Sequence, residues 1–389
     1  MSNAVTGAPL APPIPQATAD EPVSEVGQLS QWTLIRMRFA RNRLAMFGLI
    51  GLICMYIVVF LGPFVAPNEY TFQNQNYIFG GPSQFTFIGP SGNFGLTLYM
   101  FGSTSVLDEK NFRFVVKTDY SKKIPVQLFA PGDAYKLLGF IHTNIHLFNV
   151  APASNERIYL MGTDSLGRDM FARTLIGGQV SMTVGLLGVA ISIVIGSILG
   201  TTSGYFAGLA DDIIQRIIEV ITSFPTIPLW AALAAALPPI SESFTALDRY
   251  FLITVVLSLI GWTGLARQLR AKVMAYNQAD FCQAAIAAGS TDRRIIFTHM
   301  LPNAASHIIV TAALSIPGMI LGETALSFLG LGILPPMVSW GALLRDSQQV
   351  SVIIEHPWIL IPGAAVIITV MLFSFLGDGL RDAVDPYSI

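Results

Sequence analysis

The stretch Ala279-Asp-Phe-Cys-Gln-Ala-Ala-Ile-Ala-Ala-Gly-Ser-Thr-Asp-Arg-Arg-Ile-Ile-Phe-Thr-His-Met-Leu-Pro-Asn303 is a polar, charged segment between two apolar segments, each long enough to cross a membrane. Its pattern predicts two short helices separated by Gly289. Asp280 followed by Gln283 fits a capping box, and Ser290-Thr291 can cap the second helix. Paired short helices at a membrane surface have a shape suited to docking a partner, so this loop is where we expect the protein to receive work from another chain.

The composition places most of the chain in lipid. Of its 389 residues, 52% are hydrophobic and only 12% are charged, whereas soluble domains average about 25% charged residues. The net charge of −2 gives no bias toward nucleic acid. Cys54 lies in an apolar segment and Cys282 in the polar loop, so we expect neither a disulfide between them nor a cysteine metal site.

Six apolar segments predict six membrane spans, since a span needs roughly 17 to 25 residues. Pro225 and Pro228 should kink the third span, and Pro317 lies inside the fifth. The fourth segment is short. The predicted spans cover residues 44–67, 182–206, 220–237, 250–266, 304–328 and 358–377.

The distribution of basic residues predicts the orientation, because short cytoplasmic loops are enriched in Lys and Arg. The short loops of one side hold only Arg249 and Arg345. The opposite side is therefore predicted to be cytoplasmic, together with both termini and the 279–303 loop. It holds Arg36, Arg38, Arg41, Arg43, Arg216, Arg267, Arg270, Lys272, Arg293, Arg294 and Arg381.

The remaining segments differ in character. Residues 1–30 are rich in Pro, Ala and Ser and have no apolar core, which predicts a disordered cytoplasmic tail. Residues 31–67 are a basic amphipathic segment and the first span. Residues 68–160 form a long loop on the outer side, and residues 161–389 hold spans two to six with a cytoplasmic loop at 267–303.

The long outer loop predicts a small strand-containing domain. Residues 84–89 and 112–117 alternate apolar and polar side chains, as half-buried strands do. Gly and Pro predict turns at 80–82, 89–90 and 131–132. The segment 163–175 is typical of an amphipathic helix leading into the second span. The predicted fold is thus an all-α polytopic membrane protein of about six spans, with a strand-containing extracytoplasmic insertion between the first two.

Several catalytic patterns are missing from the sequence. It has no Gly-x-x-x-x-Gly-Lys-Ser/Thr phosphate loop, no His-Glu-x-x-His, no Cys/His cluster with metal spacing and no Gly-x-Ser-x-Gly. We therefore expect a non-catalytic chain without a cofactor of its own.

The polar loop carries a recognisable spacing. The loop contains Gln283-Ala284-Ala285, then three residues and Gly289, then nine residues and His299-Met300-Leu301-Pro302. This spacing resembles the EAA motif of ABC importer permeases, Glu-Ala-Ala-x3-Gly-x9-Ile-x-Leu-Pro. Gln283 stands for the usual Glu and His299 for Ile, the latter as in the peptide-permease branch. The first departure puts an ion pair with the ATPase in doubt, but not docking itself.

The residue types suit that role. Ala284 and Ala285 are small enough for close approach of a partner, and Gly289 permits a sharp turn. Leu301-Pro302 ends the loop and starts the fifth span, where a proline in a first turn costs no hydrogen bond. Arg293 and Arg294 supply charge for a partner or for lipid headgroups. The alternative is a plain interfacial helical hairpin.

Three other stretches carry the same resemblance. Each is similar to a segment of oligopeptide and dipeptide permeases. They are Gly162-Thr-Asp-Ser-Leu-Gly-Arg-Asp169, Gly322-Glu-Thr-Ala-Leu-Ser-Phe-Leu-Gly-Leu-Gly332 and the end Leu376-Gly-Asp-Gly-Leu-Arg-Asp-Ala-Val-Asp-Pro386. With Pro335-Pro336 and Ser339-Trp-Gly341 they cover residues 160–389 in the family's order. The resemblance is to the C-type permease of the pair, and the long insertion is typical of only a subset.

The resemblance implies a type I ABC importer permease in a bacterial inner membrane. It implies pairing with a homologous second permease, two ATPase subunits that hold ATP and Mg, one of which contacts the loop, and a periplasmic or lipid-anchored substrate-binding protein. Closure of the ATPases would switch the spans between inward-open and outward-open states. Membrane lipids are the remaining expected partner.

Single polar residues leave alternatives open. Glu323, the one acid in a predicted span, could line the translocation path, since charges in a bilayer usually face a cavity or a partner; it could instead cap a helix or pair structurally. Asp164, Arg168 and Asp169 could contact the binding protein or gate, or form a local ion-pair network. His307 fits a structural hydrogen bond better than proton coupling.

Two further functions remain open on sequence grounds. A permease of the same family could carry nickel or another small solute instead of peptides. A secondary transporter would need ion-coupling acids within its spans and often an internal repeat, whereas the sequence offers only Glu323 and no evident repeat. An intramembrane hydrolase would need a Ser/His or Asp/Asp pairing that the predicted spans lack.

Overall fold

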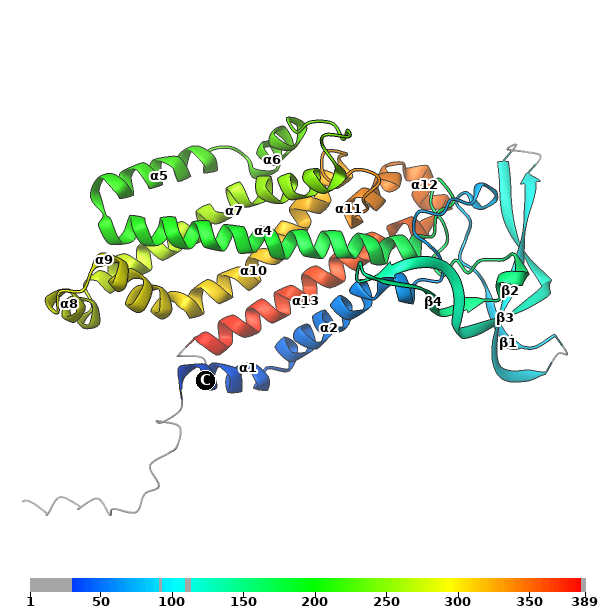
Figure 1. The fold of residues 1–389 in the computed structure, drawn as a ribbon, viewed down its shortest axis with the longest axis horizontal. Helices are drawn as coiled ribbons and strands as arrows, with labels where there is room; N and C mark the ends of the chain where they lie inside the picture. The colour runs from blue at the N-terminus through cyan, green and yellow to red at the C-terminus, as the bar shows by residue number, and fades with distance from the viewer. Residues whose placement is uncertain (1–29, 91–92, 109–112, 386–389) are drawn as a thin grey trace, which may run out of the picture.

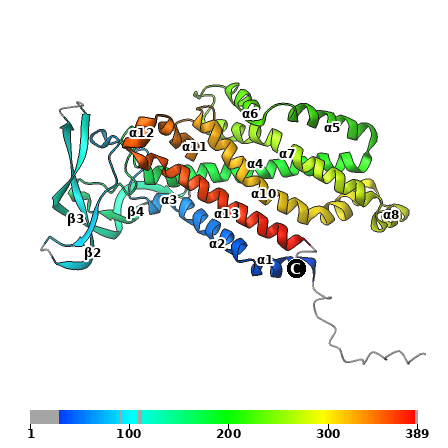
Figure 2. The same cartoon turned by 180° about the vertical axis from the view of Figure 1, so that it is seen from behind.

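A long helical bundle with a small β-sheet at one end makes up the structure, a computed structural model that describes residues 30–90, 93–108 and 113–385 (Figure 1). Seen from behind, the bundle has the same order, with the sheet at one end and α8 at the other (Figure 2). The predicted disordered tail lies outside the described residues, apart from Ser30.

Thirteen α-helices are found in the described residues. They are α1 Gln31–Arg41, α2 Arg43–Phe60, α3 Gly62–Val65, α4 Met170–Phe206, α5 Gly208–Thr222, α6 Thr226–Ala235, α7 Ala246–Asn277, α8 Asp280–Ala287, α9 Asp292–Arg294, α10 Leu301–Phe328, α11 Trp340–Leu343, α12 Val350–Glu355 and α13 Ile361–Val384. A π-helical turn over Ile295–Met300 joins α9 to α10. Short 3-10 turns cover Gln75–Tyr77, Pro152–Ser154, Leu344–Gln348 and Pro357–Leu360.

Among the described residues, five helices are long and apolar enough to cross a membrane, or six if one bent pair counts as a span. The bent pair corrects the predicted third span. Instead of one kinked helix over 220–237, α5 ends at Thr222 and α6 starts at Thr226, with an 86° bend between them. Pro225 occupies the N-cap of α6, where its missing N–H breaks no helical hydrogen bond.

Small residues bring α4 and α7 into backbone contact. Every fourth residue of α4 from Gly188 to Gly204 is Gly or Ser, a spacing that places them on one helix face. A Cβ added at Gly200 would lie 2.5 Å from the Ala266 carbonyl oxygen, and one at Gly204 would lie 2.6 Å from that of Arg270. Only glycine therefore permits this packing, as in many membrane helix pairs.

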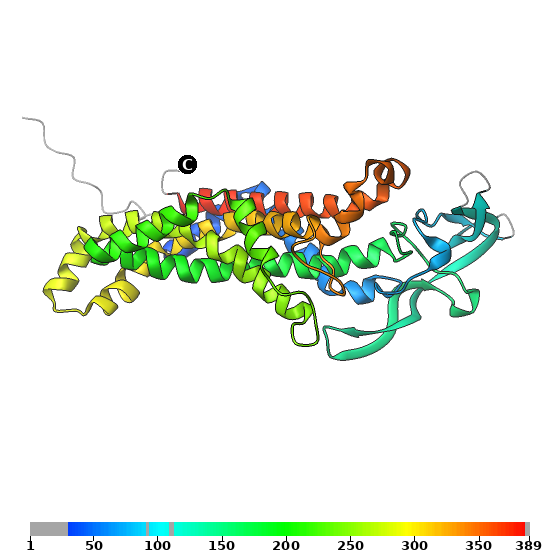
Figure 3. The same ribbon diagram turned by 90° about the horizontal axis from the view of Figure 1, so that it is seen from above.

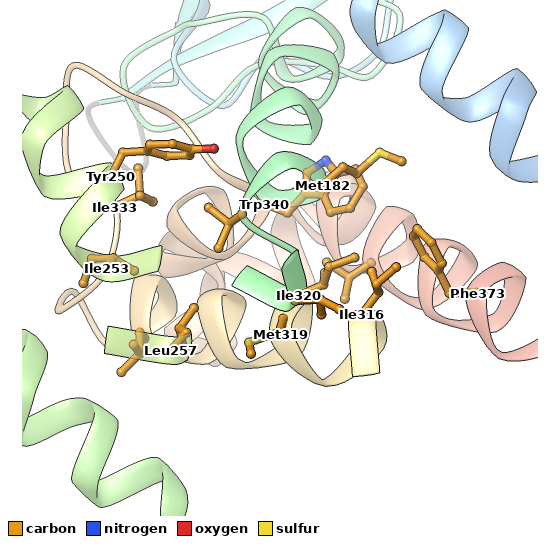
Figure 4. Packing of buried hydrophobic residues seen from close by; sticks show 14 of the residues in the cluster. Met182, Tyr250, Ile253, Leu257, Ile316, Met319, Ile320, Ile333, Trp340 and Phe373 are labelled. Carbon is orange, nitrogen blue, oxygen red and sulfur yellow. The ribbon is translucent and has the colours of Figure 1, made fainter. Parts of the chain in front are cut away.

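The main core lies where α4, α7, α10 and α13 meet. Met182, Leu257 and Ile320 are fully buried there, and Figure 4 shows them with Trp340 of α11 and Phe373 of α13. This core positions both the α10–α11 connection and the far end of α4.

The sheet lies in the chain between α3 and α4 and has the order β1-β2-β3-β4, with all pairs antiparallel. Its strands are β1 Phe85–Ile88, β2 Phe94–Asp108, β3 Arg113–Leu137 and β4 Ile141–Val150. The two predicted strands are confirmed. The predicted turn at 131–132 is wrong, because Pro131 lies within β3, at a register shift that continues to Tyr135. A bulge is one of the places where a sheet tolerates proline.

The predicted helix over 163–175 is wrong in its first half. Asp164 accepts hydrogen bonds from the backbone N–H groups of Leu166 and Arg168, which holds a tight loop in place of a helical turn. The helix starts at Met170, with Asp169 as the N-cap that accepts from Phe171 N at 2.9 Å. Polar side chains that satisfy nearby N–H groups compete with helix formation in this way.

Candidate coupling loop and buried polar sites

The 279–303 loop projects from the end of the bundle opposite the sheet (Figure 1). Helix α8 ends at Ala287, and Gly289 follows with φ +75°. Gly289 N donates to Ile286 O and Ser290 N donates to Ala285 O, which is the Schellman pattern of helix ends. The predicted glycine between two helices is thus present, and the positive φ explains why glycine stands there.

The predicted capping box is wrong. Ala279 occupies the N-cap of α8 and makes no side-chain capping bond. Gln283 instead donates from Nε2 to the Asn277 carbonyl oxygen at 2.7 Å, which ties α8 to the end of α7. Thr291 does occupy the next N-cap, without a side-chain bond.

One side of the loop is buried and the other is open. Cys282 and Ala285 pack with Ile295 and Met300 in a small core, and burial raises the pKa of the Cys282 thiol. The opposite side exposes three large apolar side chains together with charged and small ones. This loop surface consists of Phe281, Ile286, Phe297, Arg293 and Arg294, with Asp280, Gln283 and Ala284 also exposed.

The second helix of the loop is not a separate short helix. It begins at Asp292 and continues through the π-turn into α10, which gives one helix from Asp292 to Phe328. Pro302 is the second residue of α10, in the first turn as we predicted, although the π-turn leads into it without a break. His299 lies in the wide turn just before it, and its carbonyl oxygen accepts from the Asn303 side chain at 2.7 Å.

Hydrogen bonds join the loop to the end of α4. Tyr205 OH donates to Asp292 Oδ1 at 2.7 Å, and Asn277 Nδ2 donates to Tyr205 O at 3.3 Å. Sequence reasoning missed Tyr205, because no spacing pattern links residue 205 to residue 292. These hydrogen bonds tie the loop to α4.

A polar clamp fixes the start of α5 beside the same end of the bundle. Arg270 of α7 binds both carboxylate oxygens of Asp211, and Ser203 of α4 donates to Asp211 as well. Two-pronged pairing of this kind holds a guanidinium in a defined orientation. The positive-inside pattern included Arg270, but nothing in the sequence named its partner.

At the other end of the bundle, Asp164 and Asp169 are buried. Asp164 Oδ2 lies 2.8 Å from Arg168 Nε and 3.3 Å from Arg173 Nε, so the ion-pair network that we considered is present. Asp169 accepts from Asn68 Nδ2 at 2.9 Å. Burial raises the pKa of Asp169 to about 7, although the bonds from Asn68, Phe171 and Ala172 act in the opposite direction. Contact of these residues with a binding protein stays a prediction.

Glu323 is completely buried between α10, α4 and α11. Ser181 Oγ donates to its Oε2 at 2.8 Å and Ser327 Oγ donates to its Oε1 at 2.6 Å. The two hydroxyls in turn accept from the backbone N–H groups of Trp340 and Ile333. This arrangement fits the structural alternative, because the carboxylate organises the α10–α11 connection; a role in the path stays a prediction.

His307 is the last predicted polar residue. Its Nε2 lies 3.0 Å from Gln268 Oε1, so the expected structural hydrogen bond is present between α10 and α7.

Comparison with known families places the chain. The model described as "Binding-protein-dependent transport system inner membrane component" matches residues 163–387, and "N-terminal TM domain of oligopeptide transport permease C" matches residues 30–82. The chain belongs to the family of inner-membrane components of binding-protein-dependent transport systems. It is a membrane-spanning permease component of an ABC importer, and ATP hydrolysis in this family belongs to partner ATPases.

Individual relatives align over somewhat less than two thirds of this chain. An oligopeptide transport system permease protein OppC of Haemophilus influenzae is 41% identical over 63% of this chain and 75% of its own length. A glutathione transport system permease protein GsiD of Pectobacterium atrosepticum is 38% identical over 61% and 75%. A chain of the inward-facing MetNI methionine ABC transporter aligns at 15% identity over 56% of this chain and 98% of its own, with a TM-score of 0.42.

Proposed function

We propose that this chain is the C-type permease of a type I ABC importer for peptides. The support for the substrate class is the set of relatives, whose names describe oligopeptide, dipeptide and glutathione permeases. We further propose a second, homologous permease as its partner, two ATPase subunits that hold ATP and Mg, and a periplasmic or lipid-anchored binding protein.

The observation that carries the coupling role is the loop surface. Phe281, Ile286 and Phe297 are exposed at the tip of the bundle, beside the positive charges of Arg293 and Arg294. Exposed apolar side chains rimmed by charge are typical of interfaces between proteins. Gln283 donates its side-chain N–H to this chain's own backbone, so docking relies on shape and apolar contact in place of the usual glutamate charge.

The orientation of the chain in the membrane follows from the proposed docking of the loop surface on an ATPase. The loop surface and both termini face the cytoplasm of a bacterial inner membrane, and residues 68–160 are a periplasmic insertion. Asp164, Arg168 and Asp169 are proposed to hold the periplasmic end of α4 in the shape that a binding protein meets.

The coupling proposal is tested by replacing apolar residues of the loop surface with charged ones. Ile286→Glu and Phe297→Glu, expressed with the neighbouring transporter genes, should lose most ATPase co-purification and peptide uptake, because a carboxylate would be buried without a partner. Leu96→Glu is the matched control, since Leu96 is fully exposed on the sheet at the other end.

Normal uptake and assembly in both loop variants would overturn the coupling role. The substrate class is tested separately, by competition of labelled peptide uptake with unlabelled dipeptide, longer peptide, glutathione and Ni²⁺. Competition by Ni²⁺ alone would replace peptides as the substrate.

A further inference from the structure

The β3–β4 hairpin, residues 126–150, is attached to the end of the first span. Asn149 Nδ2 donates to Pro67 O at 2.8 Å, and His146 Nδ1 bonds to Ala66 O. Both side chains are buried. This hairpin lies in the chain between the two matched family ranges, which end at residue 82 and resume at residue 163, so the family assignment leaves its role open.

The hairpin also reaches alongside the membrane-spanning helices. A cavity of about 290 Å³ is lined by Tyr135 and Lys136 of the hairpin, and by Pro63 of α3 and Ile176 of α4. Ile176 is the seventh residue of α4, so the contact is beyond the helix start and toward the bundle. Figure 3 shows the hairpin turned back toward the helices in the same way.

Most of its large exposed side chains are apolar, whereas His146 and Asn149 turn inward to the span and Gln127, Lys136, His142 and Asn144 are exposed. Leu128 is 73% exposed and Phe140 70% exposed, and four more large apolar residues accompany them. We name these six residues the hairpin face: Leu128, Phe129, Leu138, Phe140, Ile141 and Ile145. A hairpin surrounded by water would expose mainly polar side chains.

The charged residues of the hairpin and its apolar neighbours at the end of the first span indicate what covers this face. Residues 134–150 contain no Asp or Glu, and their one Lys or Arg is Lys136, which is exposed like His142. Phe129 lies beside Phe64 of α3, with 6.2 Å between ring centroids, and α3 directly follows α2, which exposes Ile57 and Phe60. Aromatic and basic side chains at the end of a span are typical of the membrane interface.

We propose that the hairpin face inserts into the outer-leaflet interface of the bilayer, with Lys136 and His142 directed to anionic lipid headgroups. The hairpin then anchors the insertion to the membrane beside the first span. The proposal requires α2 and α4 to cross the membrane, and it is independent of the transported solute.

Spin labels report the surroundings of the hairpin face directly. Phe140→Cys is labelled in a full chain that carries Cys54→Ala and Cys282→Ala, and is reconstituted in nanodiscs of phosphatidylcholine and phosphatidylglycerol. Leu96→Cys, on the same sheet, is the matched control. We expect collisions with oxygen to exceed those with a water-soluble nickel chelate at position 140, and the reverse at position 96.

Two results would overturn the proposal. A nickel-accessible label at position 140, equal to that at position 96, would place the hairpin in water. Low access of both reagents in the complex purified with its partner subunits would mean that protein, such as the second permease, covers the face. The same two measurements at Leu128→Cys guard against a local effect of one substitution.

Discussion

At the residue scale, Gly289 is required for its backbone conformation, whereas Glu323 is required for its side-chain contacts. Gly289 is held by backbone conformation alone, because its φ is +75° and a Cβ there would meet nothing within 4 Å. Glu323 is held by contacts alone, since both of its oxygens accept serine hydroxyls in a fully buried site. Substitutions at the two positions should therefore fail for different reasons.

Replacement of Gly289 tests the conformational requirement. Gly289→Val should lose most ATPase co-purification and uptake, because a left-handed conformation costs non-glycine residues about 1–2 kcal/mol and is worst for β-branched ones. Gly289→Asn is the matched control, since Asn tolerates this conformation and should retain most activity. Both variants should insert normally in membranes; equal activity of Val and Asn would contradict the role of the backbone turn.

Glu323→Gln tests the buried carboxylate. A carboxamide offers one acceptor oxygen where the carboxylate offers two, so one serine is left mispaired at a cost of about 1–3 kcal/mol. We expect a lower thermal unfolding midpoint of the purified protein, with the substrate profile kept. A changed substrate profile at unchanged stability would instead favour the path-lining role.

At the scale of elements, the contact between α4 and α7 depends on the absence of a Cβ atom at one position. The α4–α7 contact has no room for a Cβ at Gly200, where the Ala266 carbonyl oxygen is 2.5 Å away, whereas Gly264 of α7 has nothing within 4 Å. The start of α4 depends in the same way on Asp169, whose side chain caps the helix.

A matched pair of alanine substitutions tests the α4–α7 contact. Gly200→Ala should destabilise the protein by about 1–3 kcal/mol, because the added methyl group forces two backbones apart. Gly264→Ala should be neutral or stabilising, since Ala is the better helix former by about 1 kcal/mol. Thermal unfolding in detergent compares them; two equal midpoints would show that the helices do not pack as described.

The pH dependence of stability tests Asp169. Its pKa is raised by burial from 3.8 to about 7, so the folded state favours the protonated form. The corresponding stability is present below the unfolded pKa and is lost as pH rises through about 7. The unfolding midpoint should therefore fall as pH rises from about 4 to about 7 and change little above that, and Asp169→Asn should remove that component. An unchanged pH profile in the variant would mean that another group is responsible.

At the scale of the whole molecule, the coupling loop and the sheet lie at opposite ends of one bundle (Figure 1). Tyr205 and Arg270 connect the loop end to α4 and α5, while Glu323 and Asp169 organise the sheet end. The two ends are joined by α4, which runs from Met170 to Phe206 and forms part of both. A displacement of the loop thus has a continuous helical route to the opposite surface.

Thiol labelling in intact cells tests the proposed orientation. In a chain without its two native cysteines, Leu96→Cys should react with a membrane-impermeant reagent from outside, because the proposed orientation places the sheet in the periplasm. In cells without the ATPase genes, Ile286→Cys should react only after permeabilisation, because it lies on the loop surface. Reaction of Ile286→Cys in intact cells would show that the topology is the opposite of the one proposed.

Most of the element pattern was predictable from sequence, and the errors have local causes. Long apolar segments predicted the spans because lipid admits few charges, and alternation predicted β1 and the start of β3 but not β2 or β4. The helix over 163–175 and the capping box at Asp280 were wrong because polar side chains had competing partners, nearby N–H groups in the first case and Asn277 in the second. Pro302 lies in the first turn of α10 as predicted, but the π-turn before it joins the loop helix to that span.

The sequence by itself determined that this is a membrane protein of about six spans, with a polar loop whose Ala-Ala-Gly spacing resembles that of ABC permeases. These properties follow from composition and short-range spacing. Only the tertiary structure decided the partners of Glu323, Tyr205 and Arg270, and the exposure of the apolar hairpin face. Those depend on contacts between residues far apart in the chain, which local patterns do not encode.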